Sequence, residues 1–89
     1  MKVLYEKAFW RDINKLRDQN VSDHLALVLE EIKKATDLSV LGEIKKLKGH
    51  PSAFRIKVDD YRLGFFLEDD QVILTRFLNR KDIYKFFPK

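Results

Sequence analysis

The sequence has no cysteine, and it holds only three glycines and two prolines in 89 residues. Without cysteine the chain forms no disulfide and has no thiolate chemistry, which is compatible with a reducing compartment. The glycines, Gly42, Gly49 and Gly64, are too scattered to form a glycine-rich phosphate loop. The two histidines, His24 and His50, lie far apart with no clustered carboxylates, so we expect no metal site and no cofactor.

Long apolar runs are also missing, and the first six residues already include the acidic Glu6. We therefore expect neither a signal peptide nor a membrane span, and we expect a cytoplasmic protein without a membrane partner. The hydrophobic fraction of 45% is that of a globular chain. At this length we expect residues 1–89 to form one domain with a modest core.

Positive charge is concentrated in the second half of the chain. Residues 1–43 hold 7 Lys/Arg against 8 Asp/Glu, whereas residues 44–89 hold 11 against 6, so the net charge of +4 comes entirely from the second half. A basic surface favours a polyanion, and nucleic acid is the most common one. The alternative is that the excess charge serves solubility alone.

Residues 54–84 contain three runs of strand-forming residues separated by two acidic turns, which predicts an antiparallel meander. In the first run Arg55 and Lys57 alternate with apolar residues. In the second run Arg62 likewise lies between two residues of the apolar set. Because successive side chains on a strand point to opposite faces, one face is apolar and the other cationic. Arg80 and Tyr84 follow the third run. We interpret these residues as one functional cluster, and the alternative is an ordinary solvated sheet face.

Two helices are predicted before the meander. Phe9, Ile13 and Leu16 have helical spacing, and Ser22 is the expected N-cap of a second helix. The apolar residues of that second helix also recur at helical spacing: Leu25, Val28, Leu29, Ile32 and Ala35. A short link between the helices favours an antiparallel hairpin packed across the apolar sheet face.

The predicted fold class is α+β, with this two-helix hairpin on one face of a small, mainly antiparallel four-stranded sheet. The element order is β-α-α-β-β-β, followed by a short C-terminal helical turn, and residues 1–6 supply the first strand. Residues 36–42 are expected to form a loop, and residues 43–49 an extended segment that carries Lys45, Lys46 and Lys48. Phe86 and Phe87 either fold back onto the core or form an adhesive edge for a partner.

Four blocks in this order resemble the signature of the RelE/ParE superfamily, the small toxins of type II toxin–antitoxin systems. The blocks are Leu47-Lys48-Gly49, Phe54-Arg55-Ile56-Lys57-Val58, Asp60-Tyr61-Arg62-Leu63 and Asn79-Arg80-Lys81-Asp82-Ile83-Tyr84. The resemblance extends over nearly the whole chain, because the order of strands and helices also matches. Each block alone is weak, and the four together are fairly specific.

The resemblance implies a toxin that cuts messenger RNA in the ribosomal decoding site without a metal, with the neighbouring 2′-hydroxyl as nucleophile. Lys57, Arg62, Arg80 and Tyr84 match catalytic positions of RelE-like members. Arg55 also lies in the cationic block, and we assign it to substrate binding. Lys45, Lys46 and Lys48 complete the predicted substrate-binding set.

The chain departs from the family pattern at two positions. Many relatives have histidine where this chain has Asn79, and some have glutamate where it has Lys45. The chain thus resembles a branch that relies on lysine and arginine. A neighbouring cation makes a lysine easier to deprotonate, so Lys57 is the favoured general base, while Tyr84 beside Arg80 is the alternative.

The resemblance also implies partners. These are a cognate antitoxin protein, the ribosome and mRNA, with operator DNA bound only through the antitoxin complex. Two rival functions remain open from the sequence. One is a ParE-like toxin that inhibits DNA gyrase, and the other is a non-catalytic interaction module of the same fold.

Overall fold

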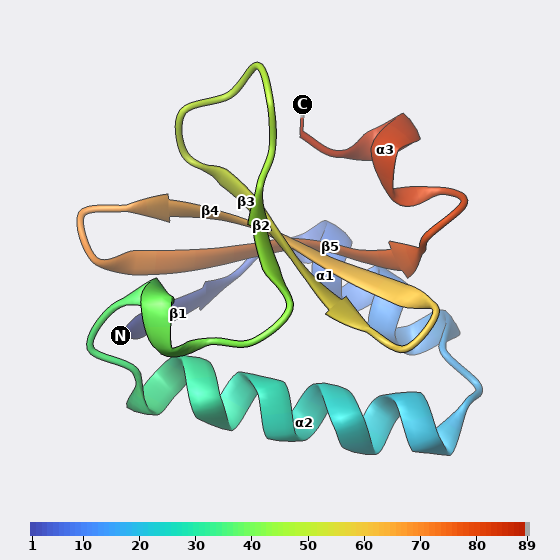
Figure 1. The fold of residues 1–89 in the computed structure, drawn as a ribbon. Coiled ribbons are helices and arrows are strands. Elements are labelled where there is room, and N and C mark those ends of the chain that lie inside the picture. The colour runs from blue at the N-terminus through green and yellow to red at the C-terminus, as the bar shows by residue number, and fades with distance from the viewer. Residues whose placement is uncertain (89) are drawn as a thin grey trace.

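The computed structural model describes residues 1–88, which form one mixed sheet with helices on both of its sides (Figure 1). The strands are β1 (Lys2–Tyr5), β2 (Ile44–Lys46), β3 (Ala53–Val58), β4 (Tyr61–Glu68) and β5 (Gln71–Asn79). The helices are α1 (Lys7–Lys15), α2 (Gln19–Lys34), a 3₁₀ turn η1 (Leu38–Val40) and α3 (Ile83–Phe86). The predicted α+β order and the C-terminal helical turn are confirmed.

The sheet has five strands in the order β1-β5-β4-β3-β2, so the prediction of four strands was wrong. The additional strand is β2, which pairs antiparallel with β3 in a register that sets Lys45 opposite Arg55. Three residues with two lysines have little intrinsic strand preference, and the hydrogen bonds of a long neighbour hold them in the sheet. At the other edge β1 pairs parallel with β5.

The inner face of the sheet packs on α2, which crosses beneath it (Figure 1). The buried core between them includes Leu25, Ile32, Ile56, Leu63 and Phe65, as the apolar parity predicts. Helix α1 adds Phe9 to this core but contacts mainly β5. It therefore flanks the sheet beyond the end of β1, and only α2 spans the face.

Helix α2 begins at Gln19, four residues before the start at residue 23 that Ser22 as N-cap predicts. Its N-cap is Asp18, whose Oδ1 accepts a hydrogen bond from the Val21 backbone N–H at 3.2 Å. Asp is as good an N-cap as Ser. The earlier start is favoured because it brings Val21, which is 5% exposed, onto the buried face of the helix.

The outer face has a second, smaller core formed by the C-terminal tail. Ile83 and Phe87 are fully buried there against Ala53, with Phe66 and Leu78 at its border. The Phe87 ring covers Gly64, where a Cβ added to the glycine would lie 2.6 Å from the ring carbon Cδ2. The tail thus folds back onto the sheet, which was one of the two predicted alternatives for it.

A buried ion pair joins α1 to β5. Asp12 is only 7% exposed. Its Oδ2 accepts hydrogen bonds from Arg76 Nε at 2.8 Å and from the Phe77 backbone N–H at 2.9 Å, and its Oδ1 accepts one from an Arg76 terminal nitrogen at 3.0 Å. These hydrogen bonds raise the pKa of the Arg76 guanidinium, against the opposing effect of burial. Asp12 thereby satisfies a backbone donor on the part of β5 that extends past β1.

We expect Gly64→Ala to destabilise the fold by about 1–3 kcal/mol, because the added methyl group displaces the Phe87 ring. The measurement is the free energy of unfolding in urea. Gly42→Ala is the matched control, since no heavy atom lies within 4 Å of its added Cβ. Equal stability of the two variants would contradict close packing of the tail on the sheet.

We expect Asp12→Ala to lower the free energy of unfolding by about 3–5 kcal/mol, because it leaves Arg76 without its buried partner. Glu30→Ala removes the exposed pair with Lys33 and should cost less than about 1 kcal/mol. Urea unfolding of both variants measures the difference. A loss of similar size in the two would show that Asp12 does not anchor α1.

Candidate RNA-binding site

The register of the sheet places four of the predicted cations on the outer face. Lys57 on β3 lies directly opposite Arg62 on β4, and Lys45 on β2 lies directly opposite Arg55 on β3. Residues that face each other across antiparallel strands share one face of the sheet. The cationic face is therefore formed by two cross-strand pairs, one above the other along β3.

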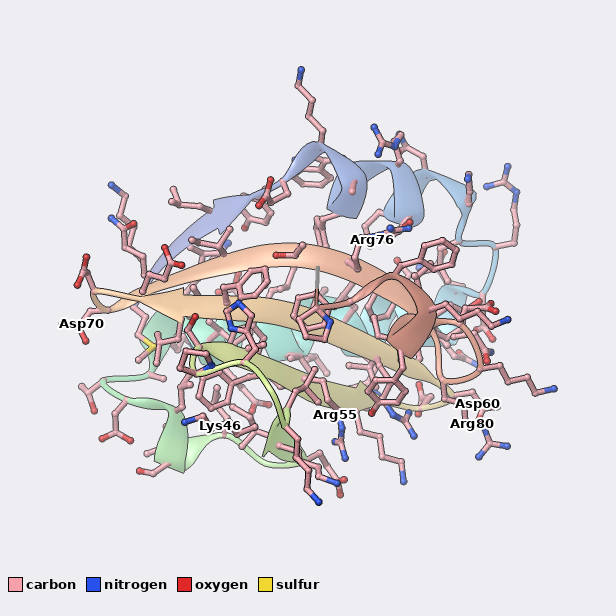
Figure 2. All side chains as sticks on the ribbon, turned by 90° about the horizontal axis from the view of Figure 1, so that it is seen from above. Lys46, Arg55, Asp60, Asp70, Arg76 and Arg80 are labelled. Carbon is pink, nitrogen blue, oxygen red and sulfur yellow. The ribbon has the colours of Figure 1, made fainter. Side chains whose placement is uncertain are left out.

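Arg80 and Tyr84 reach the same end of the sheet from the segment after β5. The Arg80 backbone N–H donates to the Asp60 carbonyl oxygen at 2.8 Å, which holds this residue beside the β3–β4 turn. Figure 2 places Arg55 and Arg80 on the same side of the molecule, below α3 in that view. Tyr84 lies on α3 with 57% of its surface exposed.

The remaining two predicted cations lie at the border of the cationic face. Lys46 lies on the outermost strand, β2, where it pairs with Phe54. Its side chain therefore points to the opposite face of the sheet from that of Lys45. Lys48 is exposed in the β2–β3 loop, which rises on the side of the sheet where α3 lies (Figure 1). Lys48 can therefore extend the cationic face, whereas Lys46 belongs to the sheet edge.

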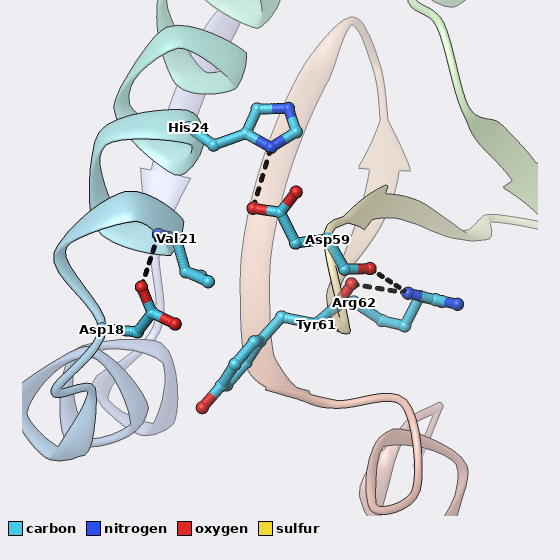
Figure 3. Close-up of polar contacts among 6 residues, drawn as sticks. All are labelled: Asp18, Val21, His24, Asp59, Tyr61 and Arg62. Carbon is cyan, nitrogen blue, oxygen red and sulfur yellow. Dashed lines mark hydrogen bonds and ion pairs between the residues drawn. The ribbon is translucent and has the colours of Figure 1, made fainter.

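Backbone carbonyl groups orient both arginines of the cationic face. One terminal nitrogen of Arg62 donates to the carbonyl oxygens of Asp59 at 3.0 Å and Tyr61 at 2.9 Å (Figure 3). Arg55 donates likewise to the Glu43 carbonyl oxygen at 2.9 Å. Its Nε is buried without a hydrogen-bond partner among residues 1–88. Each guanidinium is held through one terminal nitrogen, which leaves its other terminal nitrogen for a ligand.

The tail divides the outer face into two parts. Gly64 lies between Arg55 and Arg76 in the sheet register, and the Phe87 ring covers it. Arg76 is thereby turned toward α1, where it pairs with Asp12 and where its Cζ lies 5.1 Å from the centroid of the Phe86 ring. The cations on the other side of Phe87 remain accessible to a ligand. The planar guanidinium groups of Arg55 and Arg62 suit phosphate oxygens, and the lysines beside them add positive charge.

Arg76 and Asp12 are the charged residues whose structural importance was not predicted. A signal for Asp12 exists in the sequence, because Phe9, Asp12, Ile13 and Leu16 have the i, i+3, i+4, i+7 spacing of the apolar stripe. A carboxylate within such a stripe must find a partner when it is buried. Nothing in the sequence names Arg76 as that partner, which is 64 residues away.

Metal-ligand geometry is not found at this site. Among residues 1–88 no group of three or more His, Asp or Glu side chains is arranged to hold a metal ion. In the same part of the chain, none of the helices combines the length and the apolar character that crossing a membrane requires.

The sheet order, the helix on its inner face and the cationic outer face define the class of small toxins with the RelE fold. The RelB–RelE antitoxin–toxin complex from Methanococcus jannaschii contains a chain that matches with a TM-score of 0.81 and 33% identity. The match covers 96% of this chain and 99% of that one. The toxin in the intact Escherichia coli RelBE complex matches with a TM-score of 0.69 at 21% identity, over 88% and 94% of the two chains, which supports the fold alone.

Sequence comparison gives the family. The chain is 37% identical to Toxin RelE3 of Methanocaldococcus jannaschii over 89 residues, which is 99% of this chain and 100% of that toxin. No protein-family profile matches the chain. At this identity and coverage, the chain belongs to the RelE family of toxins, within the RelE/ParE superfamily.

Proposed function

We propose that this toxin is a ribosome-dependent mRNA endonuclease that inhibits translation in the cytoplasm, with residues 1–89 as its single catalytic domain. The observation that supports the proposal most directly is the cross-strand pair of Lys57 and Arg62 on the outer face, with the backbone of Arg80 hydrogen-bonded to the adjacent β3–β4 turn. Three cations in one place match the charge of a phosphodiester and of the transition state that forms from it.

Cleavage by the 2′-hydroxyl needs a base, stabilisation of the dianionic phosphorane and a donor for the leaving 5′-oxygen. In the proposed mechanism Lys57 takes the 2′-hydroxyl proton, and Arg62 donates to the nonbridging phosphate oxygens. Arg80 donates to the leaving 5′-oxygen, so the products are a 2′,3′-cyclic phosphate and a 5′-hydroxyl. The exposed ring of Tyr84 orients the nucleotide by stacking or hydrogen bonding.

Substrate binding is assigned to the second cation pair. Lys45 and Arg55 lie opposite each other next to the Lys57–Arg62 pair, so they can hold the neighbouring phosphate of an extended strand. Lys48 on the adjacent loop extends this contact, and Lys46 at the edge contributes long-range attraction. The ribosome supplies the orientation of the mRNA, which reduces what the isolated protein must do for catalysis.

The proposed inhibitor is a cognate antitoxin. The related toxin from Methanococcus jannaschii and the one from Escherichia coli were both solved in complexes with antitoxins. We propose that the antitoxin of this chain covers the cationic face with acidic residues, and that operator DNA is bound through that complex. An antitoxin bound in this way prevents mRNA from reaching the cationic face, because its acidic residues pair with the cations there.

We expect Arg62→Ala and Arg80→Ala each to reduce cleavage of ribosome-bound mRNA by about 10²–10³-fold, since each removes a transition-state donor. The measurement is primer extension on mRNA programmed into ribosomes, with circular dichroism to verify folding. Arg11→Ala on the exposed side of α1 is the matched control for loss of one arginine. It should cleave at the rate of the parent protein.

Full activity of both variants would overturn the proposed site. If the parent protein instead arrests growth with DNA-damage signalling while translation continues, a ParE-like action on gyrase replaces the nuclease. Normal growth on induction of a stable, folded protein would identify a non-catalytic interaction module.

We also expect RNA binding to weaken with salt, because phosphate contacts release counterions. On single strands, the slope of log K against log salt should change by about 0.7 for each contact that is lost. Arg55→Ala should reduce the magnitude of the slope by about that amount, and Arg11→Ala should not. Fluorescence anisotropy with an all-uridine oligonucleotide at several salt concentrations measures both slopes.

A further inference from the structure

The β3–β4 turn is connected to three separate parts of the molecule. The carbonyl oxygen of Asp59 accepts a hydrogen bond from the Arg62 guanidinium, and the carbonyl oxygen of Asp60 accepts one from the Arg80 backbone N–H. The Asp59 side chain faces the other way, and its Oδ2 lies 3.2 Å from Nδ1 of His24 on α2 (Figure 3). Both arginines of the proposed site thus depend on a turn that α2 holds through one contact.

The backbone of this turn has an uncommon conformation. Asp59 has φ of 56°, in the left-handed region where glycine is most readily accommodated and aspartate is tolerated. The β4–β5 turn at the opposite end of the sheet has the same feature at Asp69 and Asp70, with φ of 49° and 64° (Figure 2). That turn carries no residue of the proposed site. It therefore provides an internal control that has aspartate at a left-handed position.

The surroundings of His24 also carry charge. A cavity of about 180 Å³ between α2 and the sheet edge is lined by His24 together with Glu31, Glu43 and Lys57. The imidazole therefore faces the Asp59 carboxylate, two further carboxylates and one ammonium group. Protonated imidazole adds a charge pair to the contact with Asp59, whereas neutral imidazole can only hydrogen-bond with it.

We propose that His24 and Asp59 are positioning residues, which clamp the β3–β4 turn to α2 and so hold Arg62 and Arg80 in place for RNA cleavage. The clamp itself is a property of the fold. Its effect on cleavage depends on the proposed nuclease function.

The first test does not depend on cleavage. Amide hydrogen exchange of Arg80, read by NMR, reports opening of its hydrogen bond to Asp60. We expect His24→Gln to speed this exchange by up to about fivefold relative to the parent at the same pH. The Leu67 amide, which donates to the Ser52 carbonyl oxygen, is the internal reference and should not change.

The second test is the rate of mRNA cleavage on ribosomes. His24→Gln should reduce this rate by up to about fivefold relative to the parent. His24→Arg, which keeps a cation to pair with Asp59, should restore most of the parent rate. Asp59→Asn combined with His24→Gln should lose no more than the larger single loss, because the two act through one contact.

Asp69→Asn is the control, and it should leave both the Arg80 exchange rate and the cleavage rate at parent values. Unchanged Arg80 exchange in His24→Gln, or a His24→Arg variant that cleaves no faster than His24→Gln, would overturn the clamp. If the parent protein cleaves no mRNA while His24→Gln still speeds Arg80 exchange, the nuclease proposal fails and the clamp remains.

Discussion

The buried pair of Asp12 and Arg76 is the interaction on which the rest of the structure depends. Strand β1 ends at Tyr5, opposite Leu74. The last part of β5 therefore has no neighbouring strand on the edge that faces away from β4. Asp12 takes the place of that strand, because its carboxylate accepts from the Phe77 backbone as well as from Arg76. The pair thus closes an open sheet edge and fixes α1 at the same time. It also holds Arg76 beneath Phe86, which connects the helix side of the molecule to its C-terminal tail.

The tail in turn shapes the cationic face. Phe87 can lie against the sheet because Gly64 has no side chain, and the ring occupies the space between Arg55 and Arg76. Arg76 is thereby assigned to structure, and Arg55 stays with the accessible cations. The proposed site therefore consists of the cations on the outer face of the sheet that the tail does not cover. Its arginines are oriented by backbone carbonyl groups, which hold them near one another despite their mutual repulsion.

The sequence was sufficient to predict most of the candidate site, because parity along a strand is local. Arg55 and Lys57 alternate with buried residues, and the meander brings Arg62 beside them once the short acidic turn is recognised. Lys46 and Asp12 show where this reasoning ends. The register of β2 decides the face of Lys46, and the partner of Asp12 lies on a strand that no local pattern connects to α1. Strand register and long-range pairing depend on packing, which the local periodicity of a sequence does not specify.

The sequence by itself determined the type and order of the main elements, the apolar and cationic faces of the meander, and the resemblance to RelE toxins. These follow from side-chain periodicity and turn chemistry, which act over a few residues. Only the tertiary structure decided that β2 joins the sheet, that α2 begins at Gln19, and that Phe87 covers Gly64. It also decided that His24 meets Asp59, 35 residues further along the chain. Such contacts form because the whole core must close around them, so no single segment specifies them.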